Sequence, residues 1–276
     1  MSKDLEYRAR LTGVADNNEQ YVNVKIQGKL LEFKVKFHSQ CKPPGKRGVI
    51  RDFSPAARLA MIKEFMRIDF DLMKRPLFVT LTYPDEHAMP DHDERQVHLK
   101  VMARHLERIT GQHVPAAWRM EWAARKSGAM IGTYCPHWHL LIFRIGFIPY
   151  AQINDAWKRT IGHDGYIRTD VRRVDKNGCT QMYMAKYISK DAVSCSLVIA
   201  ANQSKIGKQY GWLRRYEIPK HPINHYDHLT DEHRRTLCDL ASEMLRHCRR
   251  DYEESFTLMG DVARDAQKIL NGEDLT

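Results

Sequence analysis

The chain has 276 residues, enough for a substantial core and for one domain or two. Lys and Arg outnumber Asp and Glu by 44 to 34, and the formal charge of +10 favours a polyanionic partner, nucleic acid before an anionic membrane surface. The sequence has no apolar run that could span a membrane and no secretory signal at its N-terminus, so we expect an intracellular protein without membrane contact. The 6 cysteines are scattered without a Cys-x-x-Cys pair, which argues against a disulfide framework or a zinc knuckle.

The first predicted element is a β-hairpin. Apolar and polar residues alternate over residues 21–26 and 31–37, and Gly28 lies between the two runs. A basic loop rich in Pro and Gly follows, which is either a phosphate-contacting arm or a solvated linker. The cations of this loop that are candidates for DNA binding are Lys42, Lys46 and Arg47.

A helix and then an alternation of strands and helices follow the loop. Ser54 and Pro55 provide an N-cap and a first-turn proline for an amphipathic helix to about residue 70. The further predicted elements are a strand at 75–83, a helix at 93–109, strands containing residues 118–122 and 135–143, a helix at 150–161, a strand at 166–174 and a helix at 179–191. This order indicates an α+β fold, with helices on one face of an antiparallel sheet and the other face available for a site.

The last part of the chain has a different pattern. Residues 207–212 form a basic aromatic segment, and Arg214 and Arg215 after it are candidates for phosphate contacts or are simply solvated. A capped helix begins near residue 230. We therefore predict three parts, which are a β-rich segment with the basic loop at 1–53, a main domain at 54–212 and a mainly helical C-terminal extension at 213–276.

Two histidines stand one residue apart in the strand at 135–143. Because strand side chains alternate, His137 and His139 share one face of the sheet, and Trp138 points to the other. The strand at 118–122 likewise places Glu121 on the face opposite its apolar residues. A carboxylate beside two imidazoles is costly on an apolar sheet unless a cation pairs with it, and a divalent metal would supply that cation.

The helix at 179–191 contains two tyrosines and two lysines at helical spacing. Tyr183 and Tyr187 are i,i+4 neighbours, as are Lys186 and Lys190, so two phenols and two ammonium groups share one surface. A phenol with a pKa of about 10 is a poor nucleophile unless cations or a metal favour the phenolate. The alternative is an amphipathic helix that only packs its tyrosines.

Three short segments occur in the chain order Phe78-Val-Thr-Leu-Thr-Tyr83, Pro136-His-Trp-His-Leu-Leu141 and Tyr183-Met-Ala-Lys-Tyr-Ile-Ser-Lys190. Together they resemble the motifs of the HUH endonucleases, and more narrowly those of the rolling-circle replication initiator (Rep) proteins of plasmids and single-stranded DNA phages. The resemblance covers roughly residues 54 to 212. One departure is the large Trp138 between the histidines, which affects packing behind the sheet more than metal binding.

The resemblance implies a ferredoxin-like or RRM-like core in which the histidine strand lies beside the strand at 78–83. It also implies that His137, His139 and Glu121 hold one divalent metal, Mg²⁺ or Mn²⁺, at the scissile phosphate. The implied fold class is thus α+β, an antiparallel sheet with helices packed on it.

The resemblance further implies the reaction and its partners. Tyr183 or Tyr187 would attack phosphorus and form a 5′-phosphotyrosine link, which leaves a free 3′-hydroxyl, and the strand would later be rejoined. Lys186 is the candidate for steering the phosphate or stabilising the phenolate, with Lys190 secondary. The substrate would be single-stranded or hairpin DNA at an origin, in the cytoplasm of a bacterial host. A separate, host-encoded polymerase would extend the 3′-hydroxyl. Because the chain has no Walker A loop, we expect the helicase to be a separate host protein as well.

Other readings remain open from the residues alone. Two histidines and a glutamate also form a facial triad for non-haem iron or a catalytic zinc site, and the tyrosines would then be incidental. The chain could instead be a non-enzymatic module that binds single-stranded nucleic acid by stacking bases on aromatic residues. Within the HUH group, a transposase or a plasmid-mobilising relaxase is a further alternative.

Overall fold

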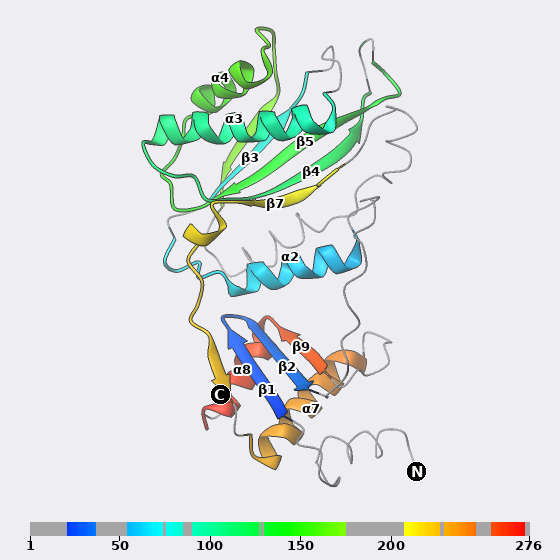
Figure 1. The fold of residues 1–276 in the computed structure, drawn as a ribbon, viewed down its shortest axis with the longest axis vertical. Coiled ribbons are helices and arrows are strands. Elements are labelled where there is room, and N and C mark those ends of the chain that lie inside the picture. Colours follow the sequence, from blue (N-terminus) through cyan, green and yellow to red (C-terminus); the bar gives the residue numbers. More distant parts are fainter. Residues whose placement is uncertain are drawn as a thin grey trace. The chain divides into compact units, whose positions relative to one another are not determined.

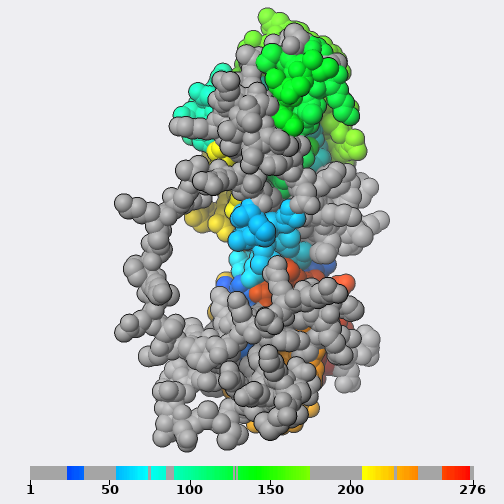
Figure 2. Space-filling view, turned by 90° about the vertical axis from the view of Figure 1, so that its right-hand side faces the viewer, coloured from blue at the N-terminus to red at the C-terminus, as the bar shows by residue number. Residues whose placement is uncertain are grey.

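The structure is a computed structural model that describes residues 21–36, 54–73, 76–84, 90–126, 128, 130–174, 207–226, 229–246 and 255–273. These residues are the coloured parts of Figure 1 and of the space-filling view in Figure 2. They form an α+β protein with antiparallel sheets and helices packed on them, which confirms the predicted fold class. The chain divides into two compact units, the first made of residues 1–45, 63–68 and 220–276, and the second of residues 46–62 and 69–219.

The second unit contains a five-stranded sheet in the order β6-β3-β5-β4-β7, with every neighbouring pair antiparallel. Its strands are β3 (Leu77–Thr82), β4 (Ala116–Ala124), β5 (Tyr134–Ile142), β6 (Thr169–Arg173) and β7 (Tyr210–Leu213). Its helices are α3 (His92–Thr110), α4 (Tyr150–Ile161) and the short η1 (Arg215–Glu217). The predicted strands and helices between residues 75 and 174 are confirmed, with ends that differ by a few residues.

Helices α3 and α4 cover one face of this sheet (Figure 1). The apolar side of each strand supplies the core, in which Trp138 of β5 and Trp157 of α4 are completely buried. The indole nitrogen of Trp157 donates a hydrogen bond to the carbonyl oxygen of Thr82 (2.9 Å), which holds the end of β3 against α4. Asp91 caps α3 by accepting from the backbone nitrogen of Glu94 (2.8 Å). The polar side of the strands is therefore the face away from α3 and α4, as predicted.

The first unit contains a four-stranded sheet in the order β8-β1-β2-β9. Its elements are β1 (Tyr21–Gln27), β2 (Leu30–Lys36), β8 (Asn224–Tyr226), α7 (Asp231–Arg246), β9 (Ser255–Met259) and α8 (Asp261–Leu270). Apolar residues of β1, β2 and β9 form one buried core with residues of α7 and α8. The predicted hairpin is confirmed, and the part after residue 213 contains two strands besides its helices. Strands of three and five residues are too short for periodicity to reveal them.

Gly28 makes the turn of this hairpin, with a positive φ of 60°. A β-carbon here would lie 2.4 Å from Cδ2 of His221 and 2.7 Å from the carbonyl oxygen of Met66. The backbone nitrogen of Lys29 donates to that same oxygen (3.0 Å). Glycine is therefore required both by the backbone conformation and by the close approach of Met66 and His221.

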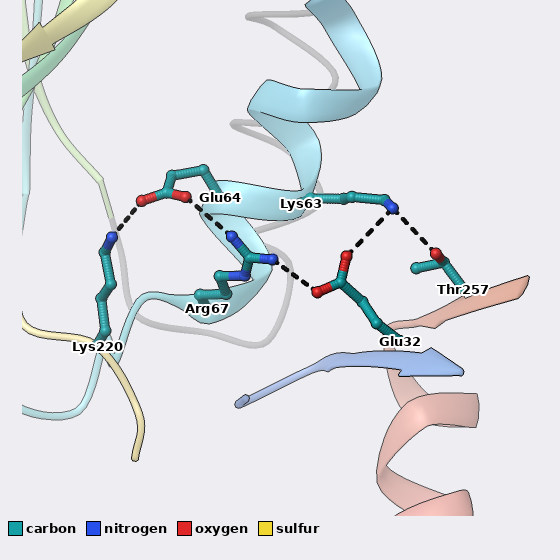
Figure 3. Close-up of polar contacts among 6 residues, drawn as sticks. All are labelled: Glu32, Lys63, Glu64, Arg67, Lys220 and Thr257. Atoms are coloured by element: carbon teal, nitrogen blue, oxygen red, sulfur yellow. Dashed lines mark hydrogen bonds and ion pairs between the residues drawn. The ribbon is translucent and has the colours of Figure 1, made fainter. Parts of the chain in front are cut away.

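Charged side chains tie the end of α2 (Pro55–Arg67) to the sheet of the first unit (Figure 3). Glu32 on β2 accepts from Nζ of Lys63 (3.5 Å) and from Nη2 of Arg67 (3.0 Å). Lys63 also donates to the hydroxyl of Thr257 on β9 (3.0 Å). The predicted helix after Ser54 is thus confirmed, and its last turn contacts both a central and an edge strand.

A second carboxylate extends this set of contacts. Glu64 is 4% exposed, and it accepts from Nη1 of Arg67 (3.3 Å) and from the ammonium group of Lys220. Each of the two carboxylates in Figure 3 therefore contacts two cations. Pairing of this kind offsets the desolvation of charges that lie largely out of water.

Candidate active site on the polar face of the sheet

The two histidines lie on the sheet face away from α3 and α4, each beside a threonine of β3, and we call this side the histidine face. The strand register pairs Thr80 with His139 and Thr82 with His137. The hydroxyl of Thr80 is hydrogen-bonded to Nδ1 of His139 (3.1 Å), and the hydroxyl of Thr82 to Nδ1 of His137 (2.8 Å). The predicted adjacency of the histidine strand and the strand at 78–83 is therefore confirmed.

Glu121 of β4 joins the two histidines from the other side. It is the register partner of His137, and its Oε2 lies 3.2 Å from Nε2 of His139. Its other oxygen, Oε1, lies 3.4 Å from Nε of Arg119, a side chain that is 1% exposed. The ring of Phe78 stacks on His139, with ring centroids 5.6 Å apart. The structure thus brings the three predicted metal ligands together on one face.

The threonine hydroxyls leave one nitrogen of each imidazole directed away from β3. A neutral imidazole has one donor and one acceptor nitrogen, and a hydroxyl can serve as the partner of either. When Nδ1 donates to the hydroxyl oxygen, the lone pair of Nε2 is available to a ligand. The arrangement of Thr82 is therefore suited to holding His137 as an Nε2 ligand, whereas Nε2 of His139 contacts Oε2 of Glu121 and would have to give up this contact to bind a metal.

His137 is a neutral side chain over most of the pH range. Burial lowers its pKa from the ordinary 6.5 to about 4, and the positive charges of Arg168 and Arg125 add to the lowering, as does His139. Glu121 acts in the opposite direction. A neutral imidazole is the form that binds a metal, so the environment of His137 favours a ligand role above about pH 4.

The donor set suits a divalent cation, but the side chains do not surround a common point. Within the described ranges, no group of three or more His, Cys, Asp and Glu side chains is placed to hold a metal ion as it stands. Glu121 and His139 are in direct contact, and Arg119 supplies a cationic partner to the carboxylate. The sequence predicted that a metal balances the charge of Glu121, but Arg119 already balances part of that charge. The imidazoles and the carboxylate remain chemically appropriate ligands for Mg²⁺ or Mn²⁺.

The predicted tyrosine motif lies outside the residues that the structure describes. This applies to Tyr183, Lys186, Tyr187 and Lys190 alike. Tyr83, at the end of β3, is described and is 1% exposed, with its hydroxyl 3.0 Å from Nδ1 of His98. Burial raises the pKa of the Tyr83 phenol above its ordinary value. Tyr83 therefore belongs to the core and is no candidate nucleophile.

The predicted DNA-binding residues fall into two groups. Lys42, Lys46 and Arg47 lie outside the described residues. Arg214 and Arg215 are exposed and follow β7, and Nε of Arg214 lies 3.1 Å from Oε1 of Glu107 on α3. Since α3 covers the other face of the sheet, this ion pair holds Arg214 on the side away from the histidines. A role for either arginine in DNA binding stays a prediction.

Several residues that support the site were not singled out from the sequence. Arg119 could have been found, because it stands two residues before Glu121 on the same strand and must share its face. Thr80 and Thr82 alternate with apolar residues of β3, but their pairing with particular histidines depends on the register. Arg168 left no signal, because nothing in the sequence brings the start of β6 beside His137.

These features define an α+β protein whose antiparallel sheet has a cluster of two histidines and a glutamate on the face opposite α3 and α4. Residues 76–192 match the model of a family described as replication-associated protein ORF2. The matched segment contains the three predicted metal ligands and the whole tyrosine motif. Comparisons with curated proteins and with solved structures gave no match. The family match supports a replication-associated protein, and within that class a replication initiator.

None of the helices in the described part of the chain is long and apolar enough to cross a membrane.

Proposed function

We propose that this chain is a rolling-circle replication initiator of the HUH type, which nicks single-stranded origin DNA and later rejoins the strand. The observation that carries the proposal is the cluster of His137, His139 and Glu121 on the histidine face, inside the segment that matches the replication-associated family. Two imidazoles and a carboxylate that share one face of a sheet are residue types suited to binding a divalent metal, and the side chains that pair with them, Thr80, Thr82 and Arg119, hold them on that face.

The distribution of charge supports a nucleic-acid substrate for this unit. The unit that contains the cluster has 26 Lys and Arg against 16 Asp and Glu, whereas the first unit has 18 of each. The whole formal charge of +10 therefore belongs to the unit with the proposed site. A concentrated positive charge attracts the phosphates of DNA without regard to sequence.

His137, His139 and Glu121 are the residues that would hold one Mg²⁺ or Mn²⁺. The chemistry that such an ion supplies when bound is neutralisation of the scissile phosphate and polarisation of its P–O bond. Thr80 and Thr82 orient the imidazoles through Nδ1, and Arg119 orients Glu121. These positioning contacts keep the ligands on one face while the DNA strand enters.

The tyrosine step exchanges one phosphoester for another. The phenolate oxygen of Tyr183 or Tyr187 forms a bond to phosphorus, the bond from phosphorus to the 3′ oxygen breaks, and that oxygen takes up a proton. Lys186 is proposed to stabilise the phenolate or the phosphate, with Lys190 secondary. In the reverse direction a 3′-hydroxyl attacks the phosphotyrosine, so rejoining needs no ATP.

A cleavage assay on single-stranded DNA of candidate origin sequence, labelled at the 5′ or the 3′ end, tests the proposal. Wild type is compared with Tyr183→Phe, Tyr187→Phe and the double variant, each with Mn²⁺ or EDTA. Tyr216→Phe is the matched control, because Tyr216 is fully exposed and far along the chain from the motif. We expect a metal-dependent adduct of protein with the 5′ end of the downstream fragment, absent only from the double variant.

Two results would contradict the proposal. Metal-dependent cleavage without an adduct would indicate a metal-activated water as the nucleophile. Tight binding without metal and without cleavage of any origin fragment would indicate a module that only binds single-stranded DNA.

A further inference from the structure

Strand β6 forms a basic edge of the histidine face that the mechanism above does not use. The register pairs Thr80 with Asp170, so residue 170 points to the same face as the threonine that is bonded to His139. Side chains two residues apart on a strand share a face, and Arg172 therefore points the same way as Asp170. Arg168 lies just before β6 in the same alternation, beside the end of β3.

Both arginines are accessible at this edge. The side chain of Arg172 is 72% exposed, and its Nε contacts Oδ2 of Asp170 (2.7 Å), which is itself 44% exposed. Arg168 is exposed and has no ion pair among the residues that the structure describes. An exposed ion pair such as that of Arg172 contributes little stability, and a phosphate can replace the carboxylate at small cost. The two arginines are separated by about 13 Å along the strand.

The side chain of Arg173, the next residue along β6, points to the opposite face of the sheet. Arg173 pairs in register with the buried Leu77, and its guanidinium lies over the ring of Phe147, 5.1 Å from the ring centroid. Arg172 and Arg173 are thus two exposed arginines, adjacent in sequence, on opposite faces of one sheet. Of these two, Arg172 alone shares the face of the histidines.

We propose that Arg168 and Arg172 bind phosphates of the single-stranded DNA that enters the site, so that the DNA passes over β6 on its way to His137. This inference rests on the proposed function, which supplies single-stranded DNA as the ligand. Asp170 lies between the two arginines and lowers the attraction of this edge for a phosphate backbone. Arg173 takes no part, because its charge is on the face that α3 and α4 cover.

The test is equilibrium binding of a fluorescein-labelled oligonucleotide of twenty thymidines, followed by fluorescence anisotropy in EDTA over a series of salt concentrations. Each phosphate contact to a single strand contributes about 0.7 to the slope of log K against log salt. We expect Arg168→Gln and Arg172→Gln each to lower the slope by about this amount and to weaken binding about fivefold at 0.1 M salt. Arg173→Gln is the matched control and should bind as wild type does. Asp170→Asn should bind more tightly.

Equal losses in Arg172→Gln and Arg173→Gln, or no loss in Arg172→Gln, would overturn the inference. Unfolding midpoints of all variants show whether a loss reflects folding instead of binding, since these exposed positions should leave the midpoint unchanged. The EDTA assay involves neither the metal nor the tyrosines, so it separates this inference from the proposed function. If binding depends on Arg168 and Arg172 but the cleavage assay gives no adduct, only the nicking chemistry is overturned. If an adduct forms but neither arginine affects binding, only the DNA path over β6 is overturned.

Discussion

The two units of this protein both place charged side chains on a sheet face, but the charges are arranged differently. In the first unit, Glu32 and Glu64 each contact two cations, and the unit as a whole has equal numbers of acidic and basic residues (Figure 3). In the second unit, one carboxylate lies among two imidazoles and an arginine, and the unit has the entire net positive charge. Charges that are balanced locally stabilise a fold, whereas an excess of ligand and cationic groups on one face is suited to a charged partner.

The largest effect on stability is expected where charges are balanced. Glu64→Ala removes a nearly buried carboxylate that contacts Arg67 and Lys220, and loss of these charged hydrogen bonds should lower the free energy of unfolding by about 2–3 kcal/mol. Urea unfolding measures this loss. Glu232→Ala on α7, at an exposed position, is the control and should change stability little. Equal losses from the two variants would show that the pairing of Glu64 is unimportant.

The pH dependence of stability should reveal His137 in the other unit. Its folded pKa of about 4 lies below the ordinary 6.5, so the unfolded chain binds a proton first as the pH falls. As the pH falls from about 6.5 to 4, His137 should therefore lower the free energy of unfolding by at most about 3 kcal/mol. Below pH 4, His137 should cause no further change. The difference between wild type and His137→Gln, measured in EDTA, isolates the contribution. An identical pH profile for the two proteins would contradict the burial of a neutral imidazole.

A smaller effect is expected from the hydroxyl that orients His137. Thr82→Val keeps the shape of the side chain but removes the hydrogen bond to Nδ1, and loss of such a partner lowers metal affinity about 10- to 100-fold. Thr82→Ser keeps the hydroxyl and should restore most of the affinity. Titration with Mn²⁺ measures affinity, and ¹⁵N spectra of the imidazoles report the tautomer without any metal. A tautomer of His137 that is the same in Thr82→Val as in wild type would contradict the positioning role.

The smallest effect is expected at Arg214. Its guanidinium pairs with Glu107 on the helix-covered side of the sheet, and the pair is partly exposed to solvent. Arg214→Gln should therefore leave the urea midpoint nearly unchanged and should weaken oligonucleotide binding less than Arg172→Gln does. A larger loss of binding from Arg214→Gln would place the DNA path over β7 and return Arg214 to its predicted role.

Much of the second unit could be predicted from the sequence because its strands alternate cleanly. The alternation in β4 and β5 placed Glu121, His137 and His139 on one polar face, and the structure confirms this face. The neighbours of each side chain could not be predicted, because they depend on the register between strands distant in sequence. The bonds from Thr80 and Thr82 to the imidazoles became visible only once the register was known.

The first unit was harder to predict because its sheet combines segments far apart in the chain. The hairpin of β1 and β2 has local signals, namely alternation and a glycine turn. Its partners β8 and β9 follow much later in the sequence, and they are too short to show a period. Glu32 and Glu64 likewise give no hint of their shared partner Arg67, since long-range ion pairs leave no pattern in the sequence.

Mn²⁺ titration followed by electron paramagnetic resonance tests whether His137, His139 and Glu121 bind a metal ion on the histidine face, as we propose. The signal of free Mn²⁺ is lost when the ion binds, so the titration counts sites and gives their affinity. We predict one site in wild type, abolished in the double variant His137→Gln/His139→Gln and retained in Glu232→Ala, which removes an exposed carboxylate of the first unit. Equal Mn²⁺ binding by wild type and the histidine double variant, or no binding by wild type, would contradict a metal site at these three residues.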